Sequence, residues 1–159
     1  MIGVRKMSRQ ASFGKDYLQS RIVAEFPIAK HIGIAVDAAD DDAVVLRAPL
    51  EANSNDKGTA FGGSLFSLAV LTGWAWVARY LEAHDLAADA VIQESTIRYL
   101  VPITGELRAI LAAPPLAQID KFRKMLQRAG RGRIRLAVDI HCEQALATHF
   151  EGVFAASVR

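Results

Sequence analysis

The chain has a single cysteine, few prolines and almost no excess of charge, and each scarcity excludes a class of protein. One thiol, Cys142, cannot form an internal disulfide, and this usage is typical of the reducing cytoplasm, where we expect the protein to act. The N-terminal residues contain no long apolar run of the kind found in signal peptides. The net charge of +2 over 159 residues is too small to indicate nucleic-acid binding by itself.

Residue patterns that hold metals or phosphates are also missing. Gly62-Gly63 has neither the spacing nor the lysine of a phosphate-binding loop. His141 and Cys142 are adjacent on an expected strand, so they point to opposite faces and cannot form a dyad; Cys142 instead continues the apolar face. The histidines show no pairing at ligand spacing, so we expect no metal and no other bound cofactor. These histidines are His31, His84, His141 and His149, the last expected on a surface or an interface.

The most distinctive feature present is a long stretch without charge, between Lys57 and Arg79. We predict a helix from about Ala60 to Ala83, roughly 35 Å long, with no breaker after its first turn except Gly73. Because this helix is apolar on nearly every face, it is either the buried axis of a domain or a membrane span. Small and polar residues dilute the apolar run, so we predict a central helix and no membrane span.

Segments on both sides of this helix predict an antiparallel sheet. Alternating apolar residues indicate strands, and Pro114-Pro115 ends one of them. We expect strand 105–113 to form a hairpin with strand 90–101 across the Thr104-Gly105 turn. The predicted order is helix 15–29, strands 32–38 and 43–50, helix 60–83, strands 90–101 and 105–113, helix 116–128, and strands 133–142 and 146–158.

These elements predict an α+β fold in which an antiparallel sheet is wrapped around one long central helix. A chain of this length, 52% apolar, fits one domain with a sizeable core. We expect that domain to span residues 1–159, with residues 1–14 flexible.

The polar loop before the central helix is the first candidate for chemistry. Asn53, Asn55 and Asp56 precede a helix whose first amide groups are unpaired and carry the positive end of the helix dipole. Gly62-Gly63 would let a ligand approach these amides, which together with an asparagine amide could stabilise a carbonyl oxygen that gains negative charge. The same residue types are also usual in helix caps and turns, so a purely structural loop remains an alternative.

A family resemblance rests on this loop and on the strand that follows the helix. The run Asn55-x-x-Gly58-x-x-Phe61-Gly62-Gly63 resembles the site loop of hotdog-fold acyl thioesterases, and Ile97 to Gly105 looks like their strand and turn. The fuller run from Asn53 to Ser64 is similar to the thioesterase-like domain at the C-terminus of YiiD-type acetyltransferase fusions. The resemblance implies a hotdog fold, a homodimer or higher oligomer, sites at the subunit boundary, and acyl-CoA or acyl carrier protein as substrate.

The loop chemistry and the resemblance together predict two sets of site residues. The catalytic set is Asn55, Gly63, Ser64 and Asp56. The substrate-binding set is Asn53, Gly58, Phe61, Gly62, Ser67, Arg131 and Arg133.

Two departures from the commoner hotdog thioesterases bear on the reaction. Phe61 stands where those enzymes carry histidine, and Val70 stands where they carry an aspartate in the helix. Hydrolysis needs a carboxylate near the carbonyl, and Asp56 or Glu94 could supply it, although Glu94 shares a face with Thr96 and Arg98 that could simply be solvated. Decarboxylation of a malonyl thioester, which needs an oxyanion site but no base, is an alternative function. A non-catalytic acyl-binding or regulatory module is a second alternative.

A basic cluster in the last third of the chain concerns the partner. It could be an ordinary solvated helix face, or it could steer acidic acyl carrier protein or the phosphates of coenzyme A. Nucleic acid is disfavoured because Phe122 is the only aromatic residue within the cluster. The cluster consists of Lys121, Arg123, Lys124, Arg128, Arg131, Arg133 and Arg135.

Overall fold

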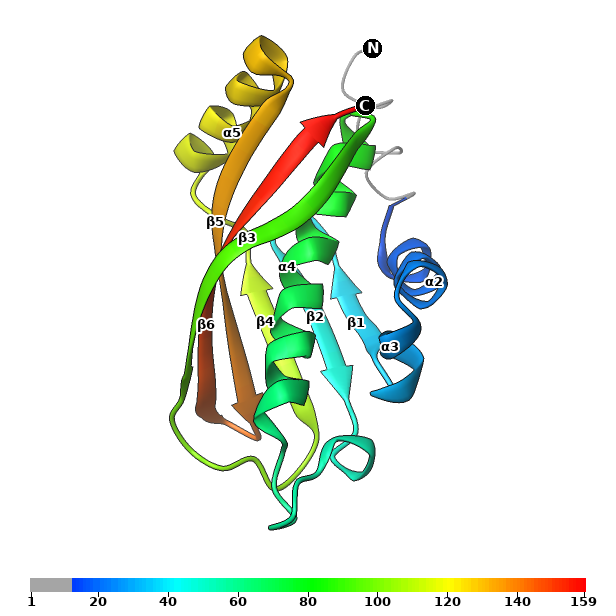
Figure 1. Cartoon of the computed structure of the whole chain (residues 1–159), viewed down its shortest axis with the longest axis vertical. Helices are drawn as coiled ribbons and strands as arrows, with labels where there is room; N and C mark the ends of the chain where they lie inside the picture. Colours follow the sequence, from blue (N-terminus) through cyan, green and yellow to red (C-terminus); the bar gives the residue numbers. More distant parts are fainter. Residues whose placement is uncertain (1–12) are drawn as a thin grey trace.

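The computed structural model describes residues 13–159, so most of the segment predicted to be flexible, residues 1–12, lies outside the described part of the chain. Helices and strands follow one another in nearly the predicted order (Figure 1). They are α2 (Lys15–Glu25), α3 (Pro27–His31), β1 (Ala35–Ala39), β2 (Ala43–Ala48), the short helix η1 (Glu51–Asn53), α4 (Gly62–Ala83), β3 (Ala88–Tyr99), β4 (Leu107–Ala112), α5 (Leu116–Ala129), β5 (Arg131–Cys142) and β6 (Ala145–Val158).

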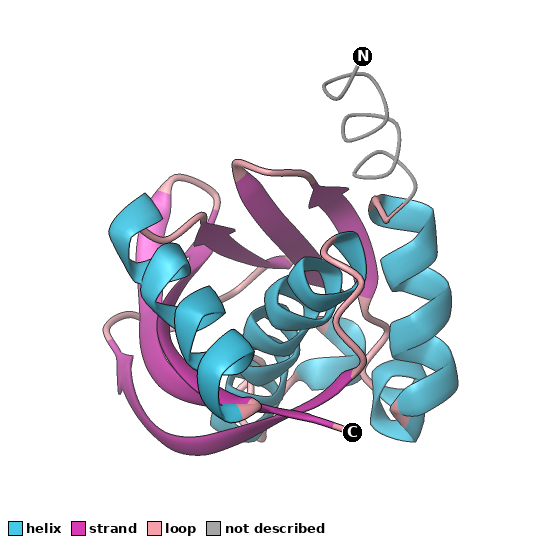
Figure 2. Ribbon diagram, turned by 90° about the horizontal axis from the view of Figure 1, so that it is seen from above, coloured by secondary structure: helices cyan, strands magenta, loops and turns pink. Residues whose placement is uncertain are grey.

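The strands form one six-stranded antiparallel sheet in the order β1-β2-β4-β5-β6-β3. The sheet curls around α4, whose axis runs along its concave face (Figures 1 and 2). The predicted α+β arrangement, a sheet wrapped around one long helix, is confirmed. Within residues 13–159, no helix combines the length and the apolar character that crossing a bilayer requires.

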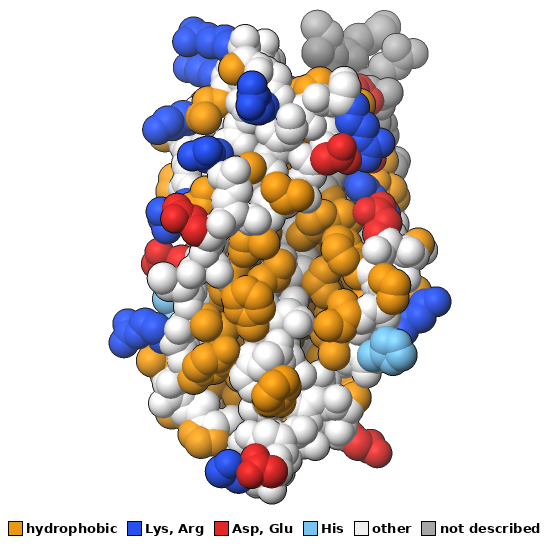
Figure 3. Space-filling view, viewed as in Figure 1, with side chains coloured by type: hydrophobic (Ala, Val, Ile, Leu, Met, Phe, Trp, Pro, Cys, Tyr) orange, Lys and Arg blue, Asp and Glu red, His pale blue; other side chains and the backbone are white. Residues whose placement is uncertain are grey.

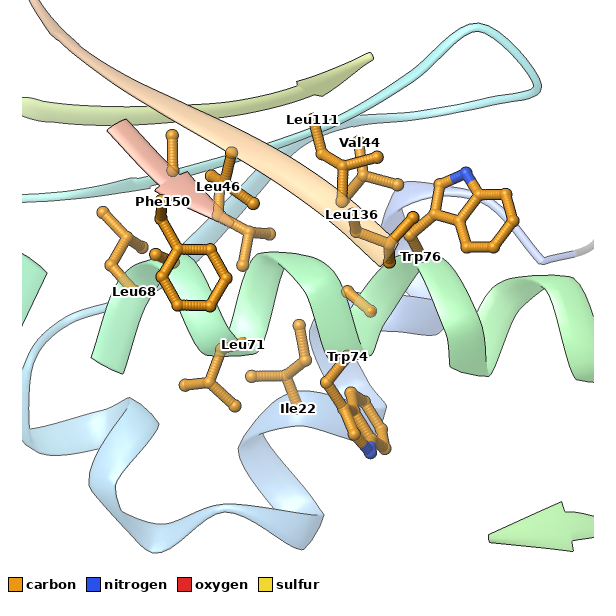
Figure 4. Close-up of a cluster of buried hydrophobic side chains, with 14 of the residues drawn as sticks. Ile22, Val44, Leu46, Leu68, Leu71, Trp74, Trp76, Leu111, Leu136 and Phe150 are labelled. Carbon is orange, nitrogen blue, oxygen red and sulfur yellow. The ribbon is translucent and has the colours of Figure 1, made fainter. Parts of the chain in front are cut away.

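The core is built on α4. From Leu68 onward the helix is buried on almost every side, because strands cover one side and α2 covers another with Leu18 and Ile22 (Figure 4). Gly73, the one breaker in the predicted helix, is where Phe154 of β6 packs: a Cβ added there would lie 2.2 Å from the phenyl Cζ. The glycine therefore permits close packing between helix and sheet.

The predicted hairpin between strands 90–101 and 105–113 is wrong. β3 pairs with β6, and β4 pairs with β2 and β5, so the two strands lie far apart in the sheet. The segment between them is instead held by backbone hydrogen bonds to residues that are distant in the sequence. The amides of Leu100 and Val101 donate to Ala147 O, and Ala60 N donates to Ile103 O at 2.9 Å.

The predicted helix 15–29 is also incorrect in its extent, because it is divided in two. Phe26 adopts an extended conformation with φ −122° and ψ 97° between α2 and α3. The ring of Pro27 disfavours helical backbone at the residue before it, while proline itself suits the first position of the next helix.

α5 takes the place of a strand along part of β5. β4 pairs with β5 only at residues 139–141, so the first half of β5 has no strand on that side. Gln118 of α5 donates its side-chain N–H to Arg135 O there. Phe122 and Leu126 pack against Gly132, where a Cβ would lie 3.0 Å from the phenyl ring. The helix therefore covers a sheet edge that would otherwise expose backbone groups.

Candidate functional site

The N-terminus of α4 has no side-chain cap. Phe61, at the N-cap position, is extended with φ −68° and ψ 130°, and makes no capping hydrogen bond. The first bond of the helix runs from Leu65 N to Phe61 O at 3.1 Å. The amides of Gly62, Gly63 and Ser64 therefore lack an acceptor within the helix and form its positive end.

Two aromatic rings lie against the two glycines of this first turn. A Cβ on Gly62 would be 3.3 Å from the Tyr99 ring, and a Cβ on Gly63 would be 2.5 Å from Cε1 of Phe61. The Tyr99 hydroxyl donates to Gly62 O at 3.0 Å. A larger residue at either position would displace one of these rings, and with it a wall of the turn.

A groove of about 260 Å³ adjoins this turn. Its walls come from the residues just before α4 and from the segment that follows β3, so it joins two parts of the chain that are distant in sequence. Most of its side chains are apolar, and none of its nine lining residues is a carboxylate or a histidine. The lining residues are Thr59, Ala60, Gly62, Leu65, Tyr99, Leu100, Val101, Pro102 and Ile103.

Asn55 organises the loop that leads into the helix. Its Oδ1 accepts from Lys57 N at 2.8 Å and from Thr59 N at 3.1 Å. Its Nδ2 donates to Thr59 Oγ1 at 2.9 Å. Since Nδ2 carries two hydrogens, and this is its one bond to the described residues, a second N–H is left for another acceptor.

Asn53 supports the same loop from the interior. It is only 2% exposed, and its Nδ2 donates to Ile32 O at 2.8 Å and to Pro49 O at 2.7 Å. Its backbone carbonyl oxygen accepts a hydrogen bond from Phe61 N at 2.7 Å, which ties the loop to the start of α4. Both hydrogens of its side-chain amide are thus used within the chain, so Asn53 holds the loop in place from the interior. It has no amide hydrogen left for the substrate contact predicted for it.

The other loop residues predicted for the site occupy different surroundings. Gly58 has φ +74°, a left-handed conformation that favours glycine in the tight turn. Asp56 is exposed and pairs with Lys57 Nζ at 3.1 Å. Its carboxylate therefore faces solvent and the neighbouring lysine, and it does not line the groove beside the helix end.

The two serines of the catalytic and binding sets lie on α4. Ser67 is half-buried, and its hydroxyl donates to Gly63 O at 3.0 Å, so its proton is used within the helix. Ser64 is half-buried in the uncapped first turn. The structure therefore brings Ser64, Gly62, Gly63 and Phe61 together at one helix end.

Arg131 and Arg133 lie near the opposite end of α4. The ring of Phe122 in α5 is 5.7 Å from that of Tyr80, close to the C-terminus of α4 (Figure 1). Arg131 lines a groove of about 630 Å³ along α5, while Arg133 is exposed on β5 beside it. The predicted substrate-binding set therefore divides into two regions.

Polar residues on the convex face of the sheet lie away from α4. Glu94 is paired with Val153 in the register of β3 and β6, which places it on the face opposite the helix, so it does not reach the groove of its own chain. His149 on that face contacts Asp139 Oδ1 at 2.6 Å and Glu151 Oε1 at 3.3 Å. Its hydrogen bond with Asp139, and then that with Glu151, raise the pKa of the imidazole above 6.5.

No metal centre is formed by the described residues. Across residues 13–159, no three histidine, cysteine or acidic side chains converge in a way that could hold an ion.

The site residue that sequence reasoning missed is Tyr99, which comes from the end of β3 and donates a hydrogen bond to a residue 37 positions earlier. Tyr99 stands inside the strand-and-turn run from Ile97 to Gly105, and that run was the one available signal.

Comparisons with known proteins agree on one relationship. A model of the family described as "Putative thioesterase (yiiD_Cterm)" matches residues 15–158. A protein of unknown function from Chlorobaculum tepidum TLS is 31% identical, with a TM-score of 0.86 over 91% of this chain and 94% of that one. A protein from Shewanella oneidensis described as a "putative thioesterase" is 27% identical, with a TM-score of 0.81 over 91% of this chain and 97% of that one. A Pseudomonas aeruginosa protein described as "Probable Thioesterase" is 18% identical, with a TM-score of 0.77 over 91% and 95% of the two chains, a likeness of fold alone.

Proposed function

Because the chain belongs to the family described as "Putative thioesterase (yiiD_Cterm)", we propose that it acts on acyl thioesters, whose carbonyl oxygen it binds at the N-terminus of α4. The predicted hotdog fold is confirmed by the same comparisons. The observation that carries the proposal is an uncapped helix N-terminus, opened by two glycines, at the wall of an apolar groove.

The reaction step that this arrangement favours is polarisation of the thioester carbonyl. The free amides of Gly63 and Ser64 point out of the helix, and the second N–H of Asn55 is available in the adjoining loop. Fixed donors of this kind stabilise the negative charge that develops on oxygen, and one such donor is worth about 100- to 1,000-fold in kcat. Attack of water at the carbonyl carbon then gives a free acid and a free thiol.

The groove supplies a dry surface for the acyl part of the substrate. Leu65, Tyr99, Leu100 and Val101 give it apolar walls beside the helix end. We expect the thiol to be coenzyme A or the phosphopantetheine of acyl carrier protein, so the substrate brings its own carrier and the reaction uses no other cofactor.

A second copy of the chain would complete the site. β3 is a twelve-residue edge strand, and Val91 on it is 57% exposed. Hydrophobic side chains gather along the middle of the face that Figure 3 shows. At the start of α4, Phe61 is 56% exposed and Phe66 is 38% exposed. Natural proteins seldom leave so long an edge strand, with an apolar surface beside it, uncovered. We therefore propose a homodimer through β3, with the groove near its boundary.

Light scattering after size exclusion tests this assembly. The expected mass is that of a dimer at micromolar concentration. A stable monomer that is nevertheless active would contradict the dimeric site while leaving the carbonyl-binding proposal intact.

One observation favours a second reaction, the decarboxylation of a malonyl thioester. The nine residues that line the groove include no carboxylate or histidine to activate water. In this reaction the bond between the methylene and the carboxylate breaks, its electron pair forms an enolate on the thioester oxygen, and carbon dioxide leaves. A proton from water then completes an acetyl thioester. The same amides would stabilise the enolate, and no base is required.

Product analysis by mass spectrometry separates these reactions. The protein is incubated with malonyl, acetyl and longer acyl thioesters of coenzyme A and of carrier protein. Hydrolysis gives free thiol and acid, whereas decarboxylation of the malonyl substrate leaves an intact acetyl thioester. Binding without turnover of any substrate would overturn the enzymatic proposal and favour a non-catalytic acyl-binding module.

A further inference from the structure

We propose that Phe61 is a positioning residue: its apolar side chain leaves the N-cap of α4 empty, so that the amides of Gly63 and Ser64 bind the thioester oxygen and not a side chain of their own chain. This inference rests on the proposed function and assigns to it a residue that acts through those amides. It begins from the place of Phe61 at the N-cap, the position from which a side chain can accept a hydrogen bond from the first turn of a helix.

The backbone of Phe61 has the geometry of a capping residue. It is extended, with φ −68° and ψ 130°, and its carbonyl oxygen accepts the first helical bond from Leu65 N at 3.1 Å. Its amide donates to Asn53 O at 2.7 Å, which holds the residue from the other side. Serine, threonine, asparagine and aspartate at this position accept from the second or third amide of a helix. In α4 those amides belong to Gly63 and Ser64, so the missing cap is a consequence of the side chain at position 61.

The Phe61 ring lies over the turn that it leaves uncapped. A Cβ on Gly63 would be 2.5 Å from Cε1 and 3.0 Å from Cζ of the ring. Since Cα–Cβ bonds in a helix tilt toward its N-terminus, the direction in which the free amides point, the ring stands beside the approach to the Gly63 amide. A ring at this place excludes water on one side, and amide donors are more effective where water is excluded.

Two hydroxyl groups near this turn are directed at carbonyls and not at the amides. Tyr99 donates to Gly62 O at 3.0 Å, and Ser67 donates to Gly63 O at 3.0 Å. No side chain of the described residues caps the helix, although hydroxyls are close to it. The amides are therefore left for a group from outside the chain.

A buried hydroxyl at the same turn is a second sign of a ligand. Thr148 of β6 is fully buried, and its Oγ1 has no hydrogen-bond partner among the described residues. It pairs with Tyr99 in the register of β3 and β6, so its side chain leaves the sheet on the face from which Tyr99 reaches Gly62 O. Phe150, two residues further along this face, contacts Phe66 of α4 with ring centroids 6.0 Å apart. Thr148 is therefore directed at the first turn of α4, and because buried hydroxyls nearly always have a partner, this turn lacks a polar group that a ligand would supply.

Two variants that differ by one oxygen atom test the inference. Phe61→Ser and Phe61→Ala both remove the ring, but only the serine can cap α4. We expect the serine variant to melt about 2–4 °C above the alanine variant, which is the shift for one cap in a chain of this size. Exchange of the Gly63 and Ser64 amide hydrogens, followed by NMR, should be slower in the serine variant.

Activity should change in the opposite direction. Because the carbonyl must displace the introduced cap, kcat/KM of Phe61→Ser should be about tenfold lower than that of Phe61→Ala, the factor that corresponds to one cap. A gain of stability with a loss of turnover distinguishes this role from simple packing, since a residue that only supports the fold loses both together. Phe61→Thr and Phe61→Val form a second pair of nearly equal volume, which replaces the first pair if the smaller variants do not fold.

The same pair of changes at another helix start provides the control. Leu116 is 80% exposed in the first turn of α5, which packs near the C-terminal end of α4 and so lies away from the site. We expect Leu116→Ser and Leu116→Ala to have the kcat/KM of the native protein. An effect confined to position 61 then belongs to the start of α4.

Two results would overturn the inference while the enzyme remains a thioesterase. In the first, Phe61→Ser and Phe61→Ala have equal kcat/KM although amide exchange is slower in the serine variant, so a capped helix serves the reaction as well as an open one. In the second, the two variants have equal stability and equal amide exchange, so position 61 does not govern the cap. The proposed function is assessed separately, by turnover of acyl thioesters in the native protein and its loss in Asn55→Asp. A native protein without turnover would overturn both.

Discussion

Substitution of Asn55 by aspartate separates the loop-building role of this residue from its proposed role as a donor. In the native loop, Oδ1 accepts two backbone amides and Nδ2 donates to Thr59 Oγ1. A carboxylate can still accept both amides, and the threonine hydroxyl can rotate to donate to it. Asn55→Asp should therefore keep the loop, and the nearby positive end of α4 should favour the new charge.

The catalytic consequence should be large. Asn55→Asp removes the N–H that we assign to the carbonyl and puts a negative charge beside a developing anion. We expect kcat to fall at least about 100-fold, which is the scale for one oxyanion donor. KM should change much less, because the donor contributes most when charge develops on oxygen.

Asn55→Ala provides the matched comparison. It removes three hydrogen bonds at a half-buried position, so the free energy of unfolding should fall by about 2 kcal/mol, at about 1 kcal/mol or less for each bond. Thiol release monitored over substrate concentration gives kcat and KM, and denaturant unfolding gives the stability of each variant. An aspartate variant with native stability and near-native turnover would refute the donor assignment and leave Asn55 as a residue that only builds the turn.

Three further predictions concern residues around the site and in the sheet. Tyr99→Phe removes the bond to Gly62 O but keeps the ring, so stability should fall by about 1 kcal/mol in denaturant unfolding while KM stays within about twofold; an unchanged stability would show that the bond contributes nothing. Gly73→Ala places a Cβ 2.2 Å from the Phe154 ring and should cost about 1–3 kcal/mol, and Phe154→Leu in the same chain should recover part of the loss; additive effects would contradict the contact. His149 has a pKa raised above 6.5 by Asp139 and Glu151, so its stabilising effect is complete below pH 6.5 and is lost as the pH rises through the folded-state pKa. The stability difference between native protein and His149→Gln should therefore be greater at pH 5 than at pH 9, with the imidazole pKa measured by NMR, and an equal difference at both pH values would contradict it.

The central helix could be predicted from the sequence because its evidence is local. An uncharged stretch that is apolar on nearly every face forms either a buried axis or a membrane span, and the small and polar residues in this one favour the buried axis. α4 begins at Gly62, two residues after the predicted start. The strands were found for the same reason, since alternation of side chains is a property of each strand alone. The basic helix 116–128 likewise corresponds to α5, which runs from Leu116 to Ala129.

Pairing between strands could not be predicted in the same way. Strands 90–101 and 105–113 are separated by proline and glycine, which is the usual signature of a hairpin, and nothing local distinguishes a turn from a longer crossing. The path of this segment is decided by backbone hydrogen bonds, in which Ala147 O and Ile103 O accept from residues far away in the sequence. These bonds depend on the folded sheet, so no window of sequence contains them.

The roles of the loop asparagines needed the three-dimensional context for a related reason. Both residues stand in the same polar run, and composition assigns them the same chemistry. Asn53 uses both amide hydrogens on buried carbonyls, whereas Asn55 retains one. Their difference arises from Ile32 and Pro49, which are brought beneath the loop by the chain that precedes it.

The crossing after β3 is also what creates the candidate site. A tight hairpin would have kept β4 beside β3, and the segment at Val101 to Ile103 would not have reached the loop before α4. Because β4 instead pairs with β2, the chain must pass the end of α4, where Ile103 O accepts Ala60 N. This path carries Tyr99 to the glycine pair and gives the groove its second wall. The wrongly predicted hairpin between strands 90–101 and 105–113 and the missed site residue Tyr99 therefore have the same cause, which is the path of the chain between β3 and β4.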